Sequence, residues 1–273
     1  MKNKCNIKFK KRAGILIIFF IPIVLFAQSL TPPQCYGGNR LTREFIDEEM
    51  IYPSRSLNAK IEGTVELSFL VQPDGRVTDI KLTKRVADDI DAEAIRILEK
   101  ILWHPATQIG KPVVYRHWMK IKFKINKYLK HFESRDPSYY ALPYKPVDSS
   151  NIVYRRAEVD QLPRPIFTSI DRNLAAFISN NLEYPEAAFK GNVAGTVKLR
   201  FVVEPSGRIS NIEVINAVGA GCTEEAIRVL KMIKWFPGLK DKLAVRTFVP
   251  LEITFDISKK TVGGSIPSPG QVY

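Results

Sequence analysis

The sequence predicts an α+β fold made of two tandem copies of one small domain. Each copy has the order α-β-β-α-β, with a three-stranded antiparallel sheet packed by helices on one face. The main observation is an internal repeat: the sequence from Gly63 to Val77 is similar to the sequence from Gly195 to Ile209, at an offset of 132 residues (195 − 63). The similarity continues without a gap on both sides. Before this stretch it includes a Tyr-Pro pair (52–53 and 184–185), and after it an Ile-x-Phe-x-Ile motif (121–125 and 253–257). A repeat of this length indicates a duplicated domain.

The repeated stretch has the pattern of a β-hairpin. Apolar residues alternate with mainly polar ones from Thr64 to Gln72, as expected for a strand with one buried face. Pro73-Asp74-Gly75 then supplies turn residues, since Pro fixes φ and Gly accepts positive φ. After Val77 the apolar positions slip by one residue, which predicts either a β-bulge in the second strand or a late start of that strand.

Helices are expected on both sides of each hairpin. In the first copy, apolar residues at helical spacing predict helices near 37–51 and 88–102, and the second copy repeats the first of these at 173–182. Tyr52-Pro53 ends the first helix, because the residue before a proline avoids the α region. Trp103-His104-Pro105 ends the second in the same way.

A long last strand completes each copy. Apolar residues alternate from Val113 to Ile125 and from Val245 to Ile257, and we expect them to face the core. The other face carries a lysine row in the first copy, and Arg246 and Pro250 in the second. Proline cannot donate to a strand ladder, and lysines discourage pairing, so both features predict a last strand that is free along one edge.

The parts outside the two copies have their own composition. A basic segment and a short apolar run predict a signal peptide at residues 1–27, with a short N-terminal membrane anchor as the alternative. We expect the first domain at 33–126, a proline-rich linker at 127–164, the second domain at 165–257 and a disordered tail at 258–273. Two cysteines, Cys35 and Cys222, remain after the signal peptide, and whether they form a disulfide is left open.

Charge excludes one class of partner. The chain has 41 basic and 28 acidic residues, a formal net charge of +13. Six of the basic residues lie in the signal peptide, so the exported chain carries only a modest positive charge. We therefore expect no nucleic-acid binding.

These residues together resemble the C-terminal domain of TonB-type energy transducers. The resemblance rests on Tyr-Pro, Gly-Thr-Val-x-Leu-x-Phe-x-Val-x-Pro-x-Gly-Arg, Ala-Ile-Arg, Trp-x-Pro and the closing Ile-x-Phe, each present twice. We interpret the shared motif residues as structural: Tyr52, Pro53, Gly63, Gly75 and Trp103, and Tyr184, Pro185, Gly195, Gly207 and Trp235. The sequence departs from a full transducer, because residues 1–30 contain no histidine and no long spacer follows the apolar run.

The resemblance implies a periplasmic protein that binds a short segment of an outer-membrane TonB-dependent receptor. In the family this segment adds as a strand beside the last strand, a mode known as β-augmentation. An inner-membrane proton-driven motor would be a further partner if the N-terminus stays uncleaved. The implied binding residues lie at the start of each last strand: Val113, Val114, Tyr115, Arg116, His117 and Trp118, and Val245, Arg246, Thr247, Phe248, Val249 and Pro250.

The sequence is compared with two other functions, a structural module and an enzyme. A structural or assembly module would use the same edges to pair with itself or a partner, and it predicts a homodimer. An enzyme is disfavoured, because His104, His117 and His131 have no counterparts in the second copy. No nucleophile–base arrangement recurs either, so we predict no catalytic residues, no metal site and no cofactor. Whether both copies bind or only one is left open.

Overall fold

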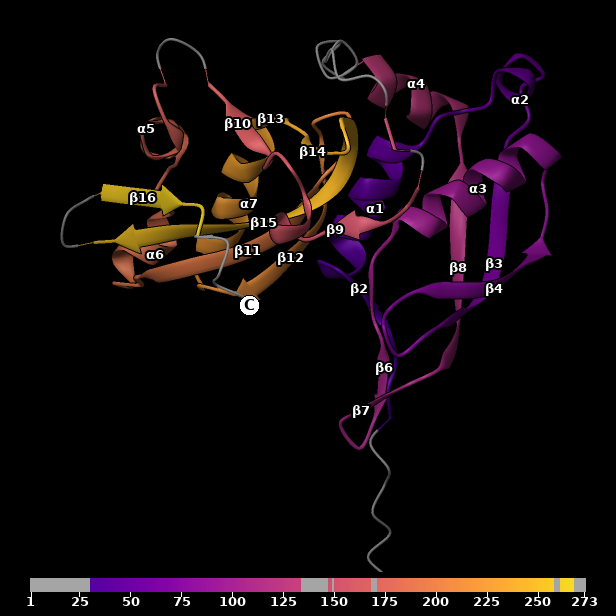
Figure 1. The fold of residues 1–273 in the computed structure, drawn as a ribbon, viewed down its shortest axis with the longest axis horizontal. Coiled ribbons are helices and arrows are strands. Elements are labelled where there is room, and N and C mark those ends of the chain that lie inside the picture. Colours follow the sequence, from indigo (N-terminus) through magenta and orange to yellow (C-terminus); the bar gives the residue numbers. More distant parts are fainter. Residues whose placement is uncertain (1–29, 134–146, 149, 168–170, 258–260, 268–273) are drawn as a thin grey trace, which may run out of the picture.

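The computed structural model describes residues 30–133, 147–148, 150–167, 171–257 and 261–267. They form two lobes side by side, one from the indigo and magenta part of the chain and one from the orange and yellow part (Figure 1). The segment predicted to be a signal peptide or anchor, residues 1–27, lies outside the described residues. No helix among the described residues is both long enough and apolar enough to cross a membrane.

The first domain contains the predicted hairpin, helices and last strand, together with short elements that the pattern did not reveal. Its central sheet has the order β4-β3-β8, with both pairs antiparallel. In chain order the elements are β1 (Leu30–Thr31), β2 (Gln34–Cys35), α1 (Gly38–Glu49), α2 (Ser54–Asn58), β3 (Gly63–Val71), β4 (Val77–Lys84), α3 (Asp88–Lys100), β5 (Trp103–His104), β6 (Ala106–Gln108), β7 (Lys111–Val113), β8 (Tyr115–Phe123) and α4 (Ile125–Glu133).

The second domain repeats this plan, but its sheet continues past the last strand. The sheet has the order β12-β11-β15-β14, and β9 and β16 also pair with β15. The elements are β9 (Val153–Tyr154), a 3-10 helix η2 (Arg156–Glu158), β10 (Arg164–Ile166), α5 (Leu174–Asn181), α6 (Glu186–Lys190), β11 (Gly195–Val203), β12 (Ile209–Asn216), α7 (Cys222–Met232), β13 (Lys234–Phe236), β14 (Gly238–Lys240), β15 (Leu243–Asp256) and β16 (Thr261–Ser265).

Alternation along the strands gives each domain its own core. On β3, Val65, Leu67 and Phe69 are completely buried and pack against α3. The corresponding residues of β11 form the centre of the second core. Burial of these side chains, worth roughly 1.5–3 kcal/mol each, stabilises both domains. Cys35 and Cys222 are both free and buried, so the disulfide that the sequence left open is not formed.

The Tyr-Pro motif begins a short helix that the predicted α-β-β-α-β order lacked. Pro53 precedes α2 and Pro185 precedes α6. Tyr52 donates its hydroxyl hydrogen to the carbonyl of Ile61, and Tyr184 does the same to Val193 at 2.7 Å. Each tyrosine thus holds the chain segment that returns from the short helix to the hairpin.

The predicted bulge is present in both domains and at the same repeat position. Pairing between β3 and β4 shifts between Ser68 and Leu70, and Asp79 on the opposite strand has φ of 47°. Pairing between β11 and β12 shifts at the equivalent place, where Asn211 has φ of 48°. Asp and Asn tolerate this left-handed conformation better than most residues. Of the two possibilities that the sequence slip left open, the structure shows the bulge and not a late start, because β4 begins at Val77.

Two segments outside the predicted domains, the linker and the tail, also form helices and strands. In the predicted linker, α4 packs against α1, and β9 pairs with β15. The predicted disordered tail is wrong for residues 261–265, because β16 forms an antiparallel pair with β15. The physical reason lies in Gly264, where a Cβ atom would come within 2.0 Å of the side chain of Ile178. A glycine lets the tail pass this close to α5 and reach β15 without displacing the buried side chain of Ile178.

The two domains meet through polar and charged side chains of the second domain and helix ends of the first. Arg208 donates to Glu49 at 2.6 Å and to the carbonyl of Glu48 at 2.7 Å. Asn211 accepts from the backbone N–H of Leu102 at 2.8 Å and donates to the carbonyl of Lys100 at 3.1 Å. The bulge residue of the second domain therefore occupies backbone groups at the end of α3.

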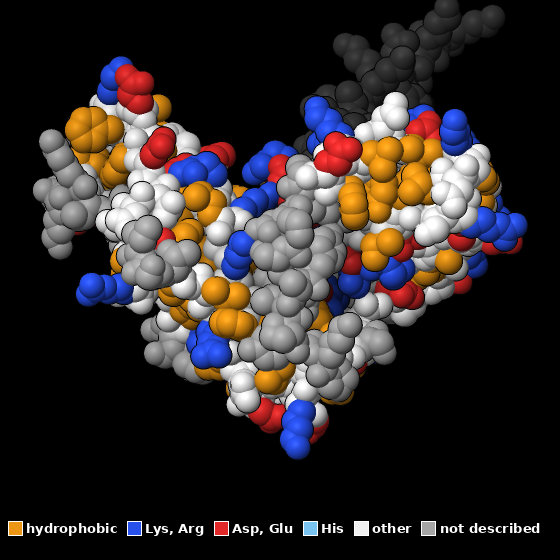
Figure 2. All heavy atoms as spheres, turned by 90° about the horizontal axis from the view of Figure 1, so that it is seen from above, with side chains coloured by type: hydrophobic (Ala, Val, Ile, Leu, Met, Phe, Trp, Pro, Cys, Tyr) orange, Lys and Arg blue, Asp and Glu red, His pale blue; other side chains and the backbone are white. Residues whose placement is uncertain are grey.

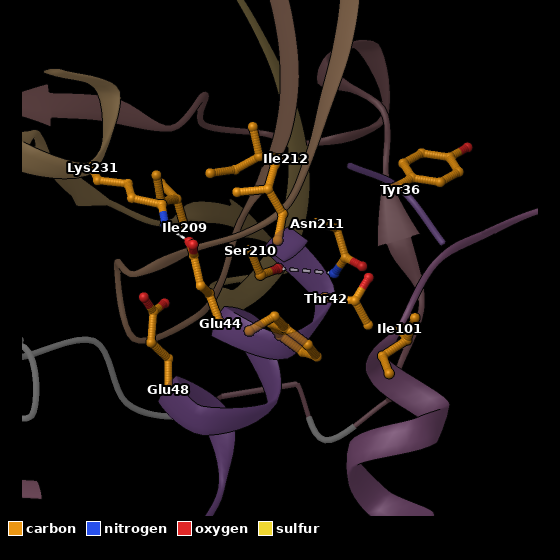
Figure 3. A pocket seen from close by; sticks show the side chains of 12 residues that line it. Tyr36, Thr42, Glu44, Glu48, Ile101, Ile209, Ser210, Asn211, Ile212 and Lys231 are labelled. Carbon is orange, nitrogen blue, oxygen red and sulfur yellow. Dashed lines mark hydrogen bonds and ion pairs between the residues drawn. The ribbon is translucent and has the colours of Figure 1, made fainter. Parts of the chain in front are cut away.

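A small hollow lies inside this interface, between α1 and β12. Figure 3 shows Glu44 of the first domain beside Lys231 of the second, which form an ion pair, and Ser210 beside Asn211. The remaining lining is mostly apolar, including Ile101, Ile209 and Ile212. The lining of the hollow includes no His or Cys side chain, so it offers neither a nucleophilic thiol nor an imidazole base.

Candidate functional site

The outer edge of β8 is the one last-strand edge that the described residues leave largely unpaired. From Tyr115 to Phe123, β8 pairs with β3 on its inner side. No described strand pairs with its outer side. Backbone N–H and C=O groups on such an edge are free to bond another chain. We therefore call residues 115–123 the open edge.

The structure divides the six predicted binding residues of the first copy between two strands. Val113 lies in β7 and pairs with Ala106, and Val114 lies between the strands. Tyr115 begins the open edge. Val113 and Val114 therefore do not belong to the open edge, because β7 pairs with β6 and β8 begins only at Tyr115.

Alternate residues of the open edge face opposite sides, as the sequence predicted. His117 lies on the core side, with its ring 5.2 Å from Trp103 and 5.8 Å from Phe69, and burial lowers the pKa of its imidazole. Arg116 and Trp118 lie on the open face, where Arg116 donates to Asp79 and Ser68. Trp118 is 58% exposed, which is unusual for this residue type and marks a surface available for contact.

The lysine row continues the open face toward α4. Lys120 pairs with Glu66 at 3.0 Å and Lys124 with Glu62 at 2.9 Å. Lys122 is exposed and makes no ion pair within the described part of the chain. The carboxylates of Glu62 and Glu66 lie toward β3, so the outer side of the row is cationic.

The far end of the open edge is bordered by α1 and α4, which the sequence reasoning did not include in the site. A shallow hollow there is lined by Asp47, Met50, Lys122, Lys124, Lys127, Tyr128 and His131. Figure 2 shows hydrophobic side chains gathered over α4, where Leu129 is 40% and Phe132 50% exposed. The helical spacing of Ile125, Leu129 and Phe132 was the signal that would have found this helix.

The equivalent edge in the second domain is mostly covered by the chain itself. On the side of β15 away from β11, β9 pairs with Arg246 and Thr247, and β16 pairs with residues 252–256. The expectation of a free last strand is therefore wrong for the second copy. Only the stretch around Pro250 lacks an outer partner among the described strands, in agreement with the missing N–H of proline.

The six predicted binding residues of the second copy are accordingly part of the fold. Val245, Thr247 and Val249 are buried. Arg246, expected on the open face, is only 3% exposed. Its guanidinium lies 3.0 Å from the buried carboxylate of Glu204 and donates to the carbonyl of Lys100 at 2.9 Å. The side chain of Arg246 is buried because it connects Glu204 of the second domain with the carbonyl of Lys100 in the first.

Phe248 is also engaged in the contact between domains. The guanidinium of Arg200 lies 5.3 Å from its ring and 5.5 Å from the ring of Tyr36. Tyr36 in turn stacks on His104 at 4.3 Å, and His104 lies 2.9 Å from Glu213. The part of the open sheet face around Arg200 and Phe248 is thus covered by the first domain, whereas Thr254 on the same face is exposed.

The shared motif residues serve the backbone and the cores. Gly75 and Gly207 have φ of 82° and 79°, and a Cβ on Gly75 would come within 2.4 Å of the carbonyl of Trp103. Trp103 and Trp235 are buried against Phe69 and Phe201 at 5.2 and 5.3 Å. The crowded glycines Gly63 and Gly195 lie close to Val86 and Val218.

The described residues contain no group of three or more His, Cys, Asp or Glu side chains placed to hold a metal ion. His104 contacts the second domain, and His117 packs on Trp103. His131 borders the hollow by α4. The three histidines therefore do not lie together. The open edge can form backbone hydrogen bonds with another strand, next to the indole of Trp118 and the lysine row.

Comparison with known proteins identifies the repeated unit. The family profile described as "Gram-negative bacterial TonB protein C-terminal" matches residues 48–125 and 180–257, together more than half of the chain. A search of curated proteins gives no match. Among solved structures, the chain is similar to the TonB C-terminal domain of Helicobacter pylori (residues 179–285), with 23% identity over 31% of this chain and 77% of that one, TM-score 0.24. It is also similar to the Pseudomonas aeruginosa TonB C-terminal domain, with 30% identity over 28% of this chain and 77% of that one, TM-score 0.24.

Proposed function

Because the chain belongs to the TonB C-terminal domain family, which is linked to TonB-dependent transport across the outer membrane, we propose that its first domain binds a segment of an outer-membrane TonB-dependent receptor. The segment adds as a strand along the open edge, residues 115–123. Backbone hydrogen bonds supply the affinity and neighbouring side chains the selectivity. The second domain does not bind at its last strand; it supports the first domain.

The difference between the two last-strand edges carries this proposal. The edge of β8 has no described partner, whereas β15 is paired by β9 and β16 along most of its outer side. A receptor segment would have to displace parts of the same chain to reach β15. On β8 the segment would form new backbone hydrogen bonds without breaking any existing strand pairing.

The proposal places the chain in the periplasm, exported by residues 1–27. With this segment cleaved, the protein acts as a soluble adaptor; with it retained, the chain stays at the inner membrane and a proton-driven motor becomes a partner. Mass spectrometry of the mature N-terminus, with its cell fraction, separates the two. A start near Gln28 in the periplasmic fraction supports the adaptor, and an intact N-terminus in the membrane fraction supports the anchored form.

Peptide titration tests the binding site. Synthetic peptides that cover the periplasm-facing N-terminal segments of outer-membrane receptors from the same organism are added to the isotopically labelled chain. We expect amide shifts in β8 and none in β15. A peptide with N-methylated backbone amides is the control, because it keeps the side chains but cannot form the ladder. Absence of shifts in β8 with every such peptide would contradict the proposal.

Site-directed crosslinking gives a second and independent test. Cysteine is placed at Lys122 or at its repeat partner Thr254, in a chain with Cys5→Ser, and a cysteine-containing receptor peptide is added under mild oxidation. Cys35 and Cys222 are buried and so serve as internal controls. We expect crosslinks at position 122 only, because β16 covers position 254.

The assembly alternative uses the same edge for pairing between two copies of the chain. Two antiparallel copies of β8 would bring their lysine rows together, and like charges directly opposite each other are destabilising. Light scattering over a range of concentrations distinguishes the two functions. A constant monomer mass supports peptide binding, and a concentration-dependent dimer supports assembly.

A further inference from the structure

Resting on the proposed function, we propose that the strand added to the open edge is acidic on one face. Two of its alternate side chains are Glu or Asp and lie beside Lys120 and Lys122. The next residue on the same face is apolar and lies beside Trp118. The partner is thus defined as an alternating acidic strand segment.

The geometry of a sheet sets this pattern. Trp118, Lys120 and Lys122 occupy alternate positions of β8, so their side chains share the open face. Directly opposite residues of an adjacent strand have Cβ atoms about 4.5–5.5 Å apart on the same face. A strand on the outer edge therefore places alternate side chains next to these three residues, whichever direction it runs.

The charges within the sheet favour acid at these positions. Lys120 has its carboxylate partner, Glu66, on the inner strand, in direct register. Lys122 has no ion-pair partner among the described residues, and its register neighbour on β3 is Thr64. The added strand would therefore complete an incomplete row of cross-strand pairs. Lys124 and Lys127 extend the positive field at the end of the edge, although each already has a carboxylate partner.

The second domain provides an internal comparison, because its equivalent pair has the opposite polarity. There Lys198 lies on the inner strand and Glu252 on the last strand, again in register. Thr254 stands where the first domain has Lys122. On the outer side, Glu252 is in register with Ser265 and Thr254 with Gly263, both neutral residues of the chain's own β16. Exposed cations thus occur on the last strand whose edge is open and not on the one whose edge is covered.

A lysine row has another use, which is to discourage edge pairing altogether. Trp118 distinguishes the two uses, since an edge protected from contact gains nothing from an indole that is 58% exposed beside the lysines. The proposal predicts that cationic residues select among strands, whereas the protective use predicts that they repel strands of every charge.

Three ten-residue peptides test the inference in the full chain. The first has Thr and Val residues with Glu at two alternate positions and an apolar residue next on the same face. The second has the same composition with one of the two Glu residues moved by one position, so that the two Glu side chains fall on opposite faces in any register. The third has Gln in place of Glu. Trp118 fluorescence reports binding, because Trp103 and Trp235 are buried, and β8 amide shifts locate it.

At low salt we expect the first peptide to bind about tenfold more tightly than the other two, as two cross-strand charge pairs suggest. The difference should nearly vanish at about 1 M salt, where the Debye length falls to roughly 3 Å. It should also vanish in the variant Lys120→Glu/Lys122→Thr, which carries the residues of the second domain. Lys84→Thr, an exposed lysine on the opposite edge strand β4, is the matched control and should leave the difference intact.

The outcomes separate this inference from the function it rests on. If all three peptides shift β8 amides with equal affinity, or if the double variant keeps the preference, the inference is wrong and the proposed function stands. If no peptide, and no receptor segment, shifts β8 amides, both are wrong. The substituted lysines are exposed, so the variants are expected to fold, and their amide spectra verify this.

Discussion

The two domains have nearly the same hairpin and the same bulge, but they use the bulge differently. In the first domain Asp79 lies at the surface and pairs with Arg116 and Lys81. In the second domain Asn211 occupies the equivalent position and bonds backbone groups of the first domain. An amide both donates and accepts, as this contact requires, whereas a carboxylate only accepts. One residue difference thus turns a surface into part of an interface.

A second difference lies beside the bulge and involves two positions that change together. The first domain has Gln72 and Val114, and the second has Glu204 and Arg246 at the equivalent places. Glu204 and Arg246 form a buried pair, 4% and 3% exposed, and Arg246 continues to the carbonyl of Lys100. Their joint appearance in one copy shows how a duplicated domain acquires a docking surface while its twin keeps an open one.

The largest effect is expected from breaking the buried pair. Arg246→Val leaves Glu204 buried without its cation and should lower the free energy of unfolding of the second domain by about 3–5 kcal/mol. Urea denaturation measures it. The double variant Glu204→Gln/Arg246→Val carries the residues of the first domain and should recover much of the loss. A single variant as stable as the parent would show that the pair does not hold the interface.

The next effect concerns pH and the carboxylate of Glu49. Burial alone would raise its pKa, but Lys100, Arg208 and Arg96 outweigh burial and lower the pKa from 4.5 to about 2. A lowered pKa contributes stability that is fully present above about 4.5 and is lost as the pH falls toward 2. The contribution is about 3 kcal/mol.

Denaturation curves between pH 5 and pH 2 measure this contribution. The variant Glu49→Gln should be less stable at pH 5 and should lack this part of the pH dependence. Glu186→Gln removes an exposed ion pair, 2.5 Å long, and serves as the control with an effect below about 0.5 kcal/mol. An unchanged pH profile in Glu49→Gln would contradict the assignment.

A third change opens the covered edge of the second domain. Gly264→Val places side-chain atoms against Ile178, so β16 should detach from β15 at a cost of about 1–3 kcal/mol. Amide exchange at residues 252–256 should then accelerate. Gly219→Val is the control, because nothing lies within 4 Å of its Cβ position. Unchanged exchange in Gly264→Val would mean that glycine is not what admits the tail.

The smallest effects compare the two bulge residues directly. Asn211→Asp removes the N–H donor to Lys100 and should cost about 1–3 kcal/mol. Asp79→Asn removes only partly exposed ion pairs and should cost less than about 1 kcal/mol. Thermal or urea denaturation of both variants measures the contrast. Equal costs would remove the claim that the two bulges differ in role.

Repetition and alternation made the domain fold predictable from the sequence. The hairpin of each copy, the bulge and the core face of each last strand all follow from local patterns that a second copy repeats. Arg246 was misplaced because alternation assigns a residue to a face but not to a partner. Its partners are Glu204, which directly follows β11, and the carbonyl of Lys100 in the other domain. Comparison of the two copies would have indicated this pair, because Gln72 and Val114 of the first are replaced by Glu204 and Arg246 in the second.

The candidate site was predictable in part. The last strand of the first copy was identified, and the structure leaves its edge open. The covering of β15 was missed, because two- and five-residue strands such as β9 and β16 have too little periodicity to recognise. The glycines of β16 suggested disorder, whereas Gly264 allows close packing against α5.

Amide hydrogen exchange of β8 and β15, with and without the alternating acidic peptide, tests the central claim most directly. In the free chain the outward-facing amides of residues 252–256 should be protected by β16, and those of the open edge should exchange rapidly. Addition of the peptide should protect amides in β8 and leave β15 unchanged. Protection of β15 with release of β16, or protection of neither strand, would contradict the account.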